Sequence, residues 1–281
     1  MGGRRFLEDE FDTPLPIVPE PACHLVLIPY EETTTYRRGT RAAPEAIVEA
    51  SSHVELFDES LRVDATLHGV ETLRPPVTDL RSITACARRL RADHPRSLLG
   101  FLGGEHSITP ALVAGCCEGE FGVVWIDAHA DLRESYLGKQ DNHACAGFHT
   151  ARLAPMVQIG VRTLAREEAE FLAHTDRVRA FTRWGEDARK AVEALPRNLY
   201  LTVDVDGFSP ELVRAVGTPE PGGLHWEEVL DIIKNLFREK SVIAFDVVEL
   251  CPDERDITST FTIAKLVYKI ISHHAYYTLG G

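Results

Sequence analysis

Short, nearly continuous apolar runs alternate with amphipathic stretches along most of this chain, and that alternation limits the folds open to it. An apolar run of strand length indicates a strand covered on both faces, as in a parallel sheet flanked by helices. The predicted strands are Leu25–Ile28, Ser97–Leu102, Gly122–Asp127, Met156–Gly160, Leu199–Val205 and Val242–Val248. The predicted helices are Pro44–Ala50, Leu80–Arg91, Pro110–Cys117, Arg166–Ala173, Trp226–Phe237 and Ser259–Ser272. This order predicts an α/β fold with a parallel β-sheet and helices on both faces.

The chain contains no internal repeat, low-complexity segment or linker that would divide it. Its 281 residues, 44% hydrophobic and 26% charged, are enough for one large core. Prolines at positions 14, 16, 19 and 21 predict that residues 1–22 form an extended arm before the first strand. We therefore predict a single domain over residues 1–281.

The formal net charge of −13 at pH 7 bears on the partners of the protein. Phosphate backbones and anionic membranes attract basic surfaces, so neither nucleic acid nor a membrane is an expected partner. Cationic small molecules or metal ions suit the charge better, although solubility alone also explains it. No apolar window approaches a membrane span, and six cysteines without a CxxC pair do not resemble a disulfide framework. These features favour a cytoplasmic protein.

Polar residues gather where four of the predicted strands end. The segments are Gly103-Gly104-Glu105-His106-Ser107, Asp127-Ala128-His129-Ala130-Asp131, Asp204-Val205-Asp206-Gly207, and Asp246 with Glu249. In open α/β sheets, ligands bind beyond the carboxyl ends of the strands. Alternate residues of an extended chain face the same way, so we expect Asp127, His129 and Asp131 to project together. Asp204 and Asp206 should do the same.

Four carboxylates and two imidazoles directed at one crevice predict a site for two metal ions. Carboxylates packed together repel one another, so some must take up protons or bind cations. Two divalent ions offset that repulsion, and a closely spaced pair also generates hydroxide near neutral pH. Each motif alone has an ordinary alternative, a capped turn for either acidic motif or a Gly-rich turn around His106. Their occurrence at successive strand ends favours the metal site.

In combination, these motifs resemble the signature of the ureohydrolases, the family of arginase, agmatinase and their relatives. Further segments that resemble the family are Tyr36–Arg41 with Pro44–Ile47, Gln158–Arg162 and Gly217–Leu224. The resemblance covers nearly the whole chain and implies the arginase-like three-layer fold. It also implies a homo-oligomer, a trimer or hexamer, which composition does not indicate.

The resemblance implies a dimanganese site and its ligands. His106 and Asp131 would bind one ion and His129 and Asp206 the other, with Asp127 and Asp204 bridging the two. Carboxylate and imidazole ligands without thiolate suit Mn²⁺. Because Ni²⁺, Co²⁺ and Zn²⁺ would bind such a set at least as tightly, the sequence leaves the metal open.

The same resemblance implies hydrolysis of a guanidinium compound to urea and an amine by a metal-bridging hydroxide. Asp131 would pass a proton to the leaving amine. Glu249 would hold the planar guanidinium through paired, charge-assisted hydrogen bonds. His143 matches the position of the family's proton-shuttling histidine, a task that suits a neutral imidazole. The ordinary alternatives are a solvated strand-end carboxylate for Glu249 and a surface-loop histidine for His143.

The loop Leu132–Gly138 bears on the substrate. It lacks the Ser-Gly-Asn-type segment with which arginase-like members hold the amino-acid end of arginine. Together with Asn142–Cys145, it is similar to agmatinases of the prokaryotic type. We therefore expect a small cationic guanidine as substrate, with agmatine hydrolysed to putrescine in polyamine biosynthesis. Arg133 complicates this expectation, because it is either an exposed, ion-paired arginine or a rim cation that holds a carboxylate, as in 4-guanidinobutyrate.

Other activities stay open at this point. Within the family they are guanidinobutyrase, aminopropylagmatine ureohydrolase, guanidinase and arginase. A catalytically silent scaffold relative would show ligand loss, whereas all six expected ligands are present. A different two-metal hydrolase, such as a phosphatase, needs a phosphate cradle that we do not find. Two departures from the family pattern, Ser209 before Pro210 and Glu105 for the commoner Asp, are expected to affect residues behind the ligands.

Overall fold

The computed structural model describes residues 3–8 and 15–280 of the chain. Its strands are β1 Cys23–Ile28, β2 Val70–Leu73, β3 Leu98–Gly103, β4 Phe121–Ile126, β5 Met156–Ile159, β6 Val178–Phe181, β7 Asn198–Asp204 and β8 Ser241–Val248. Within the described residues these eight strands form one sheet in the order β2-β1-β3-β8-β7-β4-β5-β6. Every pairing in it is parallel, as predicted.

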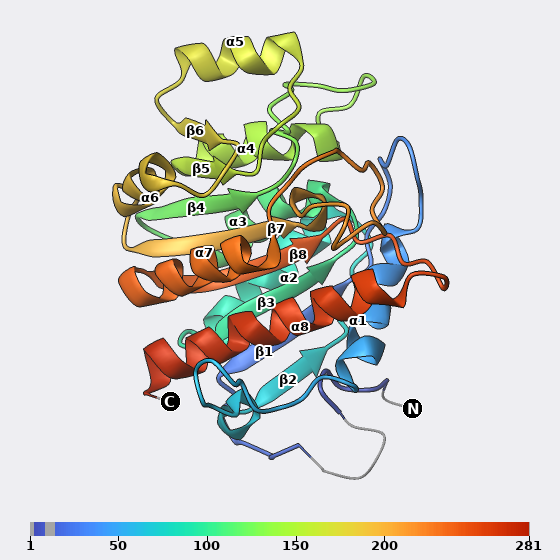
Figure 1. Cartoon of the computed structure of the whole chain (residues 1–281), viewed down its shortest axis with the longest axis vertical. Coiled ribbons are helices and arrows are strands. Elements are labelled where there is room, and N and C mark those ends of the chain that lie inside the picture. Colours follow the sequence, from blue (N-terminus) through green and yellow to red (C-terminus); the bar gives the residue numbers. More distant parts are fainter. Residues whose placement is uncertain (1–2, 9–14, 281) are drawn as a thin grey trace.

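Helices cover both faces of this sheet, so the three-layer α/β fold is confirmed (Figure 1). They are α1 Ala43–Ser51, α2 Leu80–Asp93, α3 Thr109–Cys116, α4 Ala146–Leu153, α5 Arg166–His174, α6 Glu186–Glu193, α7 Trp226–Glu239 and α8 Ile257–His274. One core cluster packs beneath α1, α6, α7 and α8, and a second beneath α2, α3 and α4. Leu25 and Leu27 of β1 join the first, whereas Val26 and Ile28 join the second, as alternation of side chains along a strand requires.

Local sequence explains where several helices begin. The Asp79 side chain accepts a hydrogen bond from the Ser82 amide at 2.7 Å and caps α2. Asp256 does the same for α8 through the Ser259 amide at 3.2 Å. The helices α1 and α3 each have a proline in the first turn, where its missing N–H costs nothing.

All six predicted strands and all six predicted helices are present, with ends shifted by a few residues, but four elements were missed. The edge strands β2 and β6 each bury only one residue of four, Val70 and Val178, so they show no apolar run. The helices α4 and α6 bury small or short side chains, such as Ala188 and Ala191 in α6, and lack large apolar residues at helical spacing.

The predicted N-terminal arm lies only partly within the described residues, because 1–2 and 9–14 fall outside them. Residues 3–8 and 15–22 form neither helix nor strand. The Phe6 and Leu7 side chains are buried, and the Leu7 amide donates to Ser51 Oγ at 2.8 Å. This part of the arm is thus packed against the first core cluster rather than freely extended.

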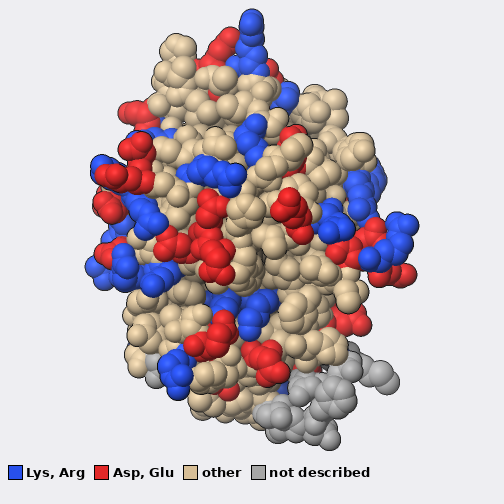
Figure 2. Space-filling view, viewed as in Figure 1, with Lys and Arg blue, Asp and Glu red and all other residues tan. Residues whose placement is uncertain are grey.

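Three further features of the molecule are its surface charges, its cysteines and the character of its helices. Figure 2 shows basic and acidic side chains intermixed over the face that it views. All six cysteines are free thiols, and five of them are buried. Among the described residues, no helix combines the length and the apolar character that crossing a membrane requires.

The strand order places the four polar strand ends beside one another. β3, β8, β7 and β4 are consecutive neighbours in the middle of the sheet, although they are far apart in sequence. The chain goes from β3 to β4, and β7 and β8 return later to fill the space between them. The carboxyl ends of these strands therefore surround one crevice, which is where α/β sheets bind ligands.

Candidate metal centre

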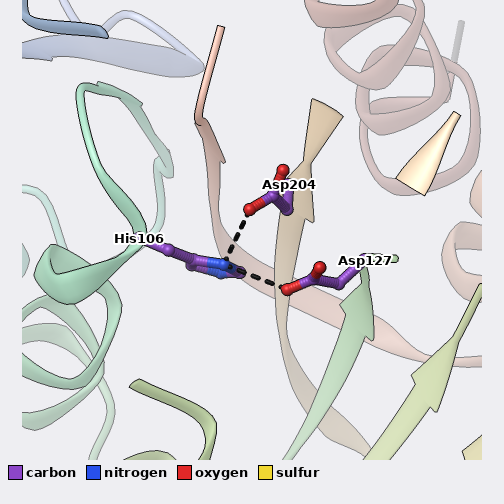
Figure 3. Close-up of side chains that lie close together, drawn as sticks. All are labelled: His106, Asp127 and Asp204. Carbon is purple, nitrogen blue, oxygen red and sulfur yellow. Dashed lines mark ion pairs between the residues drawn. The ribbon is translucent and has the colours of Figure 1, made fainter. Parts of the chain in front are cut away.

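His106 lies at the centre of a first group of side chains that could bind a metal ion. Its Nδ1 lies 3.2 Å from Asp127 Oδ2, 3.1 Å from Asp204 Oδ2 and 3.4 Å from Asp131 Oδ2. Figure 3 shows His106 reaching from the loop after β3 toward Asp127 and Asp204, which lie at the ends of β4 and β7. Three carboxylate oxygens thus converge on one imidazole nitrogen.

His129 forms a second group with the other aspartates. Its Nδ1 lies 2.9 Å from Asp206 Oδ2 and 3.6 Å from Asp127 Oδ1. Asp127 therefore presents one oxygen to each histidine, and it belongs to both groups. The structure brings together all six residues that the sequence selected as ligands, although they come from three segments of the chain.

The way these side chains converge differs from the extended geometry that we expected. Val205–Gly207 forms a turn of 3₁₀ helix, and Asp204 Oδ1 accepts the Asp206 amide at 2.9 Å. Asp127 Oδ1 likewise accepts the His129 amide at 2.6 Å, and Asp131 has a left-handed φ of 52°. The side chains project together as expected, but turns replace part of the extended chain because buried amides beyond a strand end need acceptors, and an aspartate two residues earlier supplies one.

Neighbouring groups hold the ligands in place. Trp125 Nε1 donates to Asp127 Oδ2 at 2.8 Å, and the Trp125 and His106 rings stack with centroids 4.1 Å apart. The Ala128 amide donates to Asp206 Oδ1 at 3.1 Å. Each of these contacts restricts the rotation of a ligating side chain, as ligands of a preorganised metal site require.

Arg162 supports the loop that carries Asp206. Its guanidinium donates to six backbone carbonyls at 2.8–3.3 Å. The acceptors are the carbonyl oxygens of Gly160, Asp206, Gly207, Phe208, Glu220 and Pro221. One side chain thus ties the turn after β7 to the segment that follows β5.

The hydrogen bonds behind His106 test whether the site suits a cation. Thr202 Oγ1 donates its only proton to Asp246, so it accepts from His106 Nε2 at 2.9 Å. A neutral His106 therefore directs an unprotonated Nδ1 at three carboxylate oxygens. Among the described residues this buried Nδ1 has no hydrogen-bond partner. A cation removes the conflict, and oxygen and imidazole ligands suit a hard to borderline divalent metal.

The pKa shifts of these side chains are consistent with this interpretation. Burial, followed by the charge of neighbouring carboxylates, raises the pKa of Asp131, Asp204 and Asp206. Burial also opposes ionisation of Asp127, but its close contacts with His106 and His129 hold its pKa below the usual value. Although burial lowers the pKa of His106, Asp127 and the other carboxylates raise it to about 9. The protein alone thus retains protons where metal ions would place positive charge.

A cavity of about 260 Å³ opens beside the two groups. Glu249 lines it together with four other carboxylates, those of Asp131, Glu168, Asp204 and Asp206. Glu249 Oε1 accepts the His106 amide at 2.7 Å, and the residue has a left-handed φ of 66°. Burial raises the pKa of Glu249 to about 8. Glu249 is therefore a fixed, buried group and not a solvated strand-end carboxylate.

The other two predicted residues, His143 and Arg133, also line the cavity. His143 is half-buried, and its Nδ1 lies 3.1 Å from Thr33 Oγ1. Arg133 Nη1 lies 2.9 Å from Glu167 Oε1, and its guanidinium lies over the Tyr136 ring. Arg133 thus has an ionic partner of its own at the rim.

Sequence reasoning placed Glu105 and Ser209 behind the candidate ligands but gave no role to the other residues there. Asp246 stood out as a polar residue at a strand end, but its hydrogen bonds to Thr109, Tyr200 and Thr202 depend on the tertiary structure. Arg162 stood out only as part of a family-like segment. Thr33 had no signal at all, because one hydroxyl in a run of threonines has no distinguishing pattern.

Known proteins resemble this chain over most of its length. The family model described as the arginase family matches residues 21–272. The chain is 33% identical to an N(1)-aminopropylagmatine ureohydrolase of Synechocystis, with 97% of this chain and 94% of the relative covered. It is 35% identical to an agmatinase of Pyrococcus horikoshii, covering 94% and 97%. The crystal structure of the agmatine ureohydrolase of Thermoplasma volcanium has a TM-score of 0.82 and 29% identity, covering 93% of each chain.

Proposed function

Since this chain belongs to the arginase family and is a guanidine ureohydrolase, we propose that it hydrolyses agmatine to urea and putrescine. The observation that carries this proposal is the pair of His–Asp groups that share Asp127 beneath a cavity lined by carboxylates. The same arrangement disfavours a catalytically silent relative, because none of the expected ligands is missing.

The two groups would hold two divalent ions, which we propose to be Mn²⁺. His106 with Asp131 would bind one ion and His129 with Asp206 the other. Asp127 and Asp204 would bridge them. The structure supports this assignment more directly for Asp127, which faces both histidines, than for Asp204, which faces His106. When bound, such a pair lowers the pKa of water toward neutrality and supplies the nucleophile.

The remaining steps belong to the side chains around the cavity. Glu249 would anchor the guanidinium, because a buried carboxylate gains most from a cationic partner that forms hydrogen bonds with it. As the oxygen of water bonds to the guanidinium carbon, the bond from that carbon to the substituted nitrogen breaks. Asp131 would deliver the proton that this amine needs to leave. His143 would exchange protons with solvent at the mouth of the cavity.

The charges of the cavity favour a substrate with a cationic tail. Its two arginines, Arg37 and Arg133, are both paired, with Asp253 at 3.1 Å and with Glu167 at 2.9 Å. Glu168 is buried and accepts one backbone amide at each carboxylate oxygen, so both oxygens keep a lone pair that can accept from an ammonium group. An ammonium group therefore fits this end of the cavity better than a carboxylate such as that of 4-guanidinobutyrate.

A longer polyamine tail is the second candidate, supported by relatives named N(1)-aminopropylagmatine ureohydrolase that are 33% and 34% identical. Tyr36 and Thr35 line the outer part of the cavity, and Tyr36 is exposed, so this end is open enough for an extended tail. Agmatine and aminopropylagmatine share the guanidinium end and differ only beyond the first amine.

The test is urea release from a panel of guanidines after loading with Mn²⁺ and, separately, Ni²⁺. The panel contains agmatine, aminopropylagmatine, 4-guanidinobutyrate, arginine and free guanidine. We expect the highest kcat/KM for agmatine. A higher value for aminopropylagmatine would establish the second candidate, and preference for a carboxylate-bearing compound would contradict the charge argument. Light scattering of the same protein would test the expected trimer or hexamer.

A further inference from the structure

The hydrogen bonds behind His143 point to an inference that rests on the proposed function and goes beyond it. Thr33 Oγ1 lies within hydrogen-bond distance of three groups. These are Glu105 Oε1 at 2.8 Å, His143 Nδ1 at 3.1 Å and the His143 amide at 3.0 Å. A hydroxyl has one proton to donate and two lone pairs with which to accept, so the three contacts constrain one another.

Glu105 decides the direction of these bonds. It is completely buried, and Glu105 Oε2 accepts the amides of Glu32, Thr33 and Thr34 at 2.7, 2.6 and 3.2 Å. Ser107 Oγ also donates to Glu105 Oε1. The donors around its two oxygens leave Glu105 in the role of acceptor, and the Thr33 hydroxyl is oriented to donate to Oε1. The Thr33 proton therefore goes to Glu105.

The direction at Thr33 then determines the tautomer of His143. The His143 amide takes one lone pair of Thr33 Oγ1, and the other faces His143 Nδ1. Nδ1 must carry the imidazole proton, which leaves Nε2 with its lone pair. Nε2 lies 3.5 Å from Thr35 Oγ1, and both residues line the cavity. Nε2 is thus free to accept a proton from the cavity.

We propose that Thr33 is a positioning residue that transmits the orientation of buried Glu105 to His143, with the imidazole proton on Nδ1 and Nε2 facing the substrate. Glu105 directly precedes His106, so one carboxylate links the first metal group to the loop 32–35 at the cavity wall. The relay makes His143 a proton acceptor on the cavity side in its resting state.

The kinetic test compares Thr33→Val with Thr33→Ser. Valine keeps the shape and the backbone amides that Glu105 binds, but it removes the hydroxyl. We expect Thr33→Val to lower kcat on agmatine by about 10- to 100-fold, the usual effect of losing a group that orients a catalytic residue. KM should change less, because Glu249 anchors the guanidinium. Thr33→Ser should restore most of kcat.

Thr84→Val is the matched control, because the Thr84 hydroxyl donates to Leu80 O within α2, outside the cavity lining. It should leave kcat unchanged. Equal kcat for wild type and Thr33→Val, or failure of Thr33→Ser to restore activity, would overturn the proposal.

A spectroscopic test gives a readout besides activity. Long-range ¹H–¹⁵N spectra of the Zn²⁺-loaded protein, which is diamagnetic, report the tautomer of each histidine. The His143 signal is assigned by its loss in His143→Asn. We expect the proton on Nδ1 in wild type and a mixed or reversed tautomer in Thr33→Val. A wild-type proton on Nε2 refutes the relay even if Thr33→Val does not fold. If no guanidine is hydrolysed, the proposed function fails, whereas this spectrum still decides the relay.

Discussion

Arg162 provides the sharpest test of how the site is supported. We consider Arg162→Met, which keeps much of the apolar stem and removes the guanidinium that donates to six carbonyls. A hydrogen bond from a charged group contributes about 1.5–3 kcal/mol, but the side chain has only five N–H groups and its neighbours regain water after truncation. We therefore expect a loss of about 3–5 kcal/mol in the free energy of unfolding, well below the sum of the six contacts.

The variant should also affect the metal affinities of the two groups unequally. Arg162 binds the carbonyls of Asp206 and its two successors, so its loss should loosen the turn that carries Asp206. We expect the Mn²⁺ affinity of the site around His129 and Asp206 to fall by about 10- to 100-fold. The site around His106 should change less, because Trp125 and Thr202 hold its ligands from the other side.

Urea denaturation of the metal-free protein measures the first effect, and calorimetric titration with Mn²⁺ measures the second. Arg162→Lys should recover part of both, because an ammonium has three donors and no fork. Arg183→Met is the matched control, since Arg183 is half-exposed and donates to one carbonyl, that of Gly223. A free energy of unfolding for Arg162→Met within about 1 kcal/mol of the wild-type value, as for a typical surface substitution, would refute the reasoning.

Three further predictions concern the shared ligand, a buried histidine and a crowded glycine. Asp127→Asn should reduce Mn²⁺ content at both groups and abolish urea release, because Asp127 faces both histidines. Asp141→Asn, at an exposed position, is the control. Retention of two ions with full turnover in Asp127→Asn would exclude a bridging role. Burial lowers the pKa of His274 to about 4 from 6.5, so protonation favours the unfolded state, and the stability present above pH 6.5 is lost as the pH falls toward 4. That loss amounts to about 2 kcal/mol by pH 5. Chemical denaturation at pH 7.5 and 5 should therefore show a smaller decrease in the free energy of unfolding for His274→Leu than for the wild type. Equal decreases in the two proteins would contradict this. A Cβ on Gly104 would collide with the Tyr30 carbonyl oxygen, whereas one on Gly185 would meet nothing within 4 Å. Gly104→Ala should therefore lower the free energy of unfolding by about 3 kcal/mol or more. Equal thermal midpoints for Gly104→Ala and Gly185→Ala would show that the loop before Glu105 can shift to accommodate the methyl group.

The fold was predictable wherever burial leaves a mark on composition. The central strands have apolar side chains on both faces, and α7 and α8 have an apolar stripe over one core cluster. β2 and β6 lie at the edges of the sheet, where one buried side chain in four is sufficient, so no local signal distinguishes them from loops.

The candidate ligands could be selected from the sequence, because a cation site needs several carboxylates and imidazoles and few other roles concentrate them at strand ends. Their arrangement could not be predicted from it. Asp204 and Asp206 converge through a turn that satisfies a buried amide, a requirement that exists only once the strand end is enclosed. The sharing of Asp127 between two histidines depends on the ends of β3 and β4 meeting across β8 and β7, two strands that the chain adds only later.

The residues that orient the ligands were decided by tertiary structure alone. Thr33, Thr202 and Arg162 act through a single hydroxyl or guanidinium whose partners come from distant segments, and a hydrogen bond of this kind leaves no periodicity in the chain. The sequence by itself determined which chemical groups the site contains, because their types are fixed by the charge that they must bind. Only the folded sheet decided which proton each group carries and which way it faces, because both depend on neighbours that meet after folding.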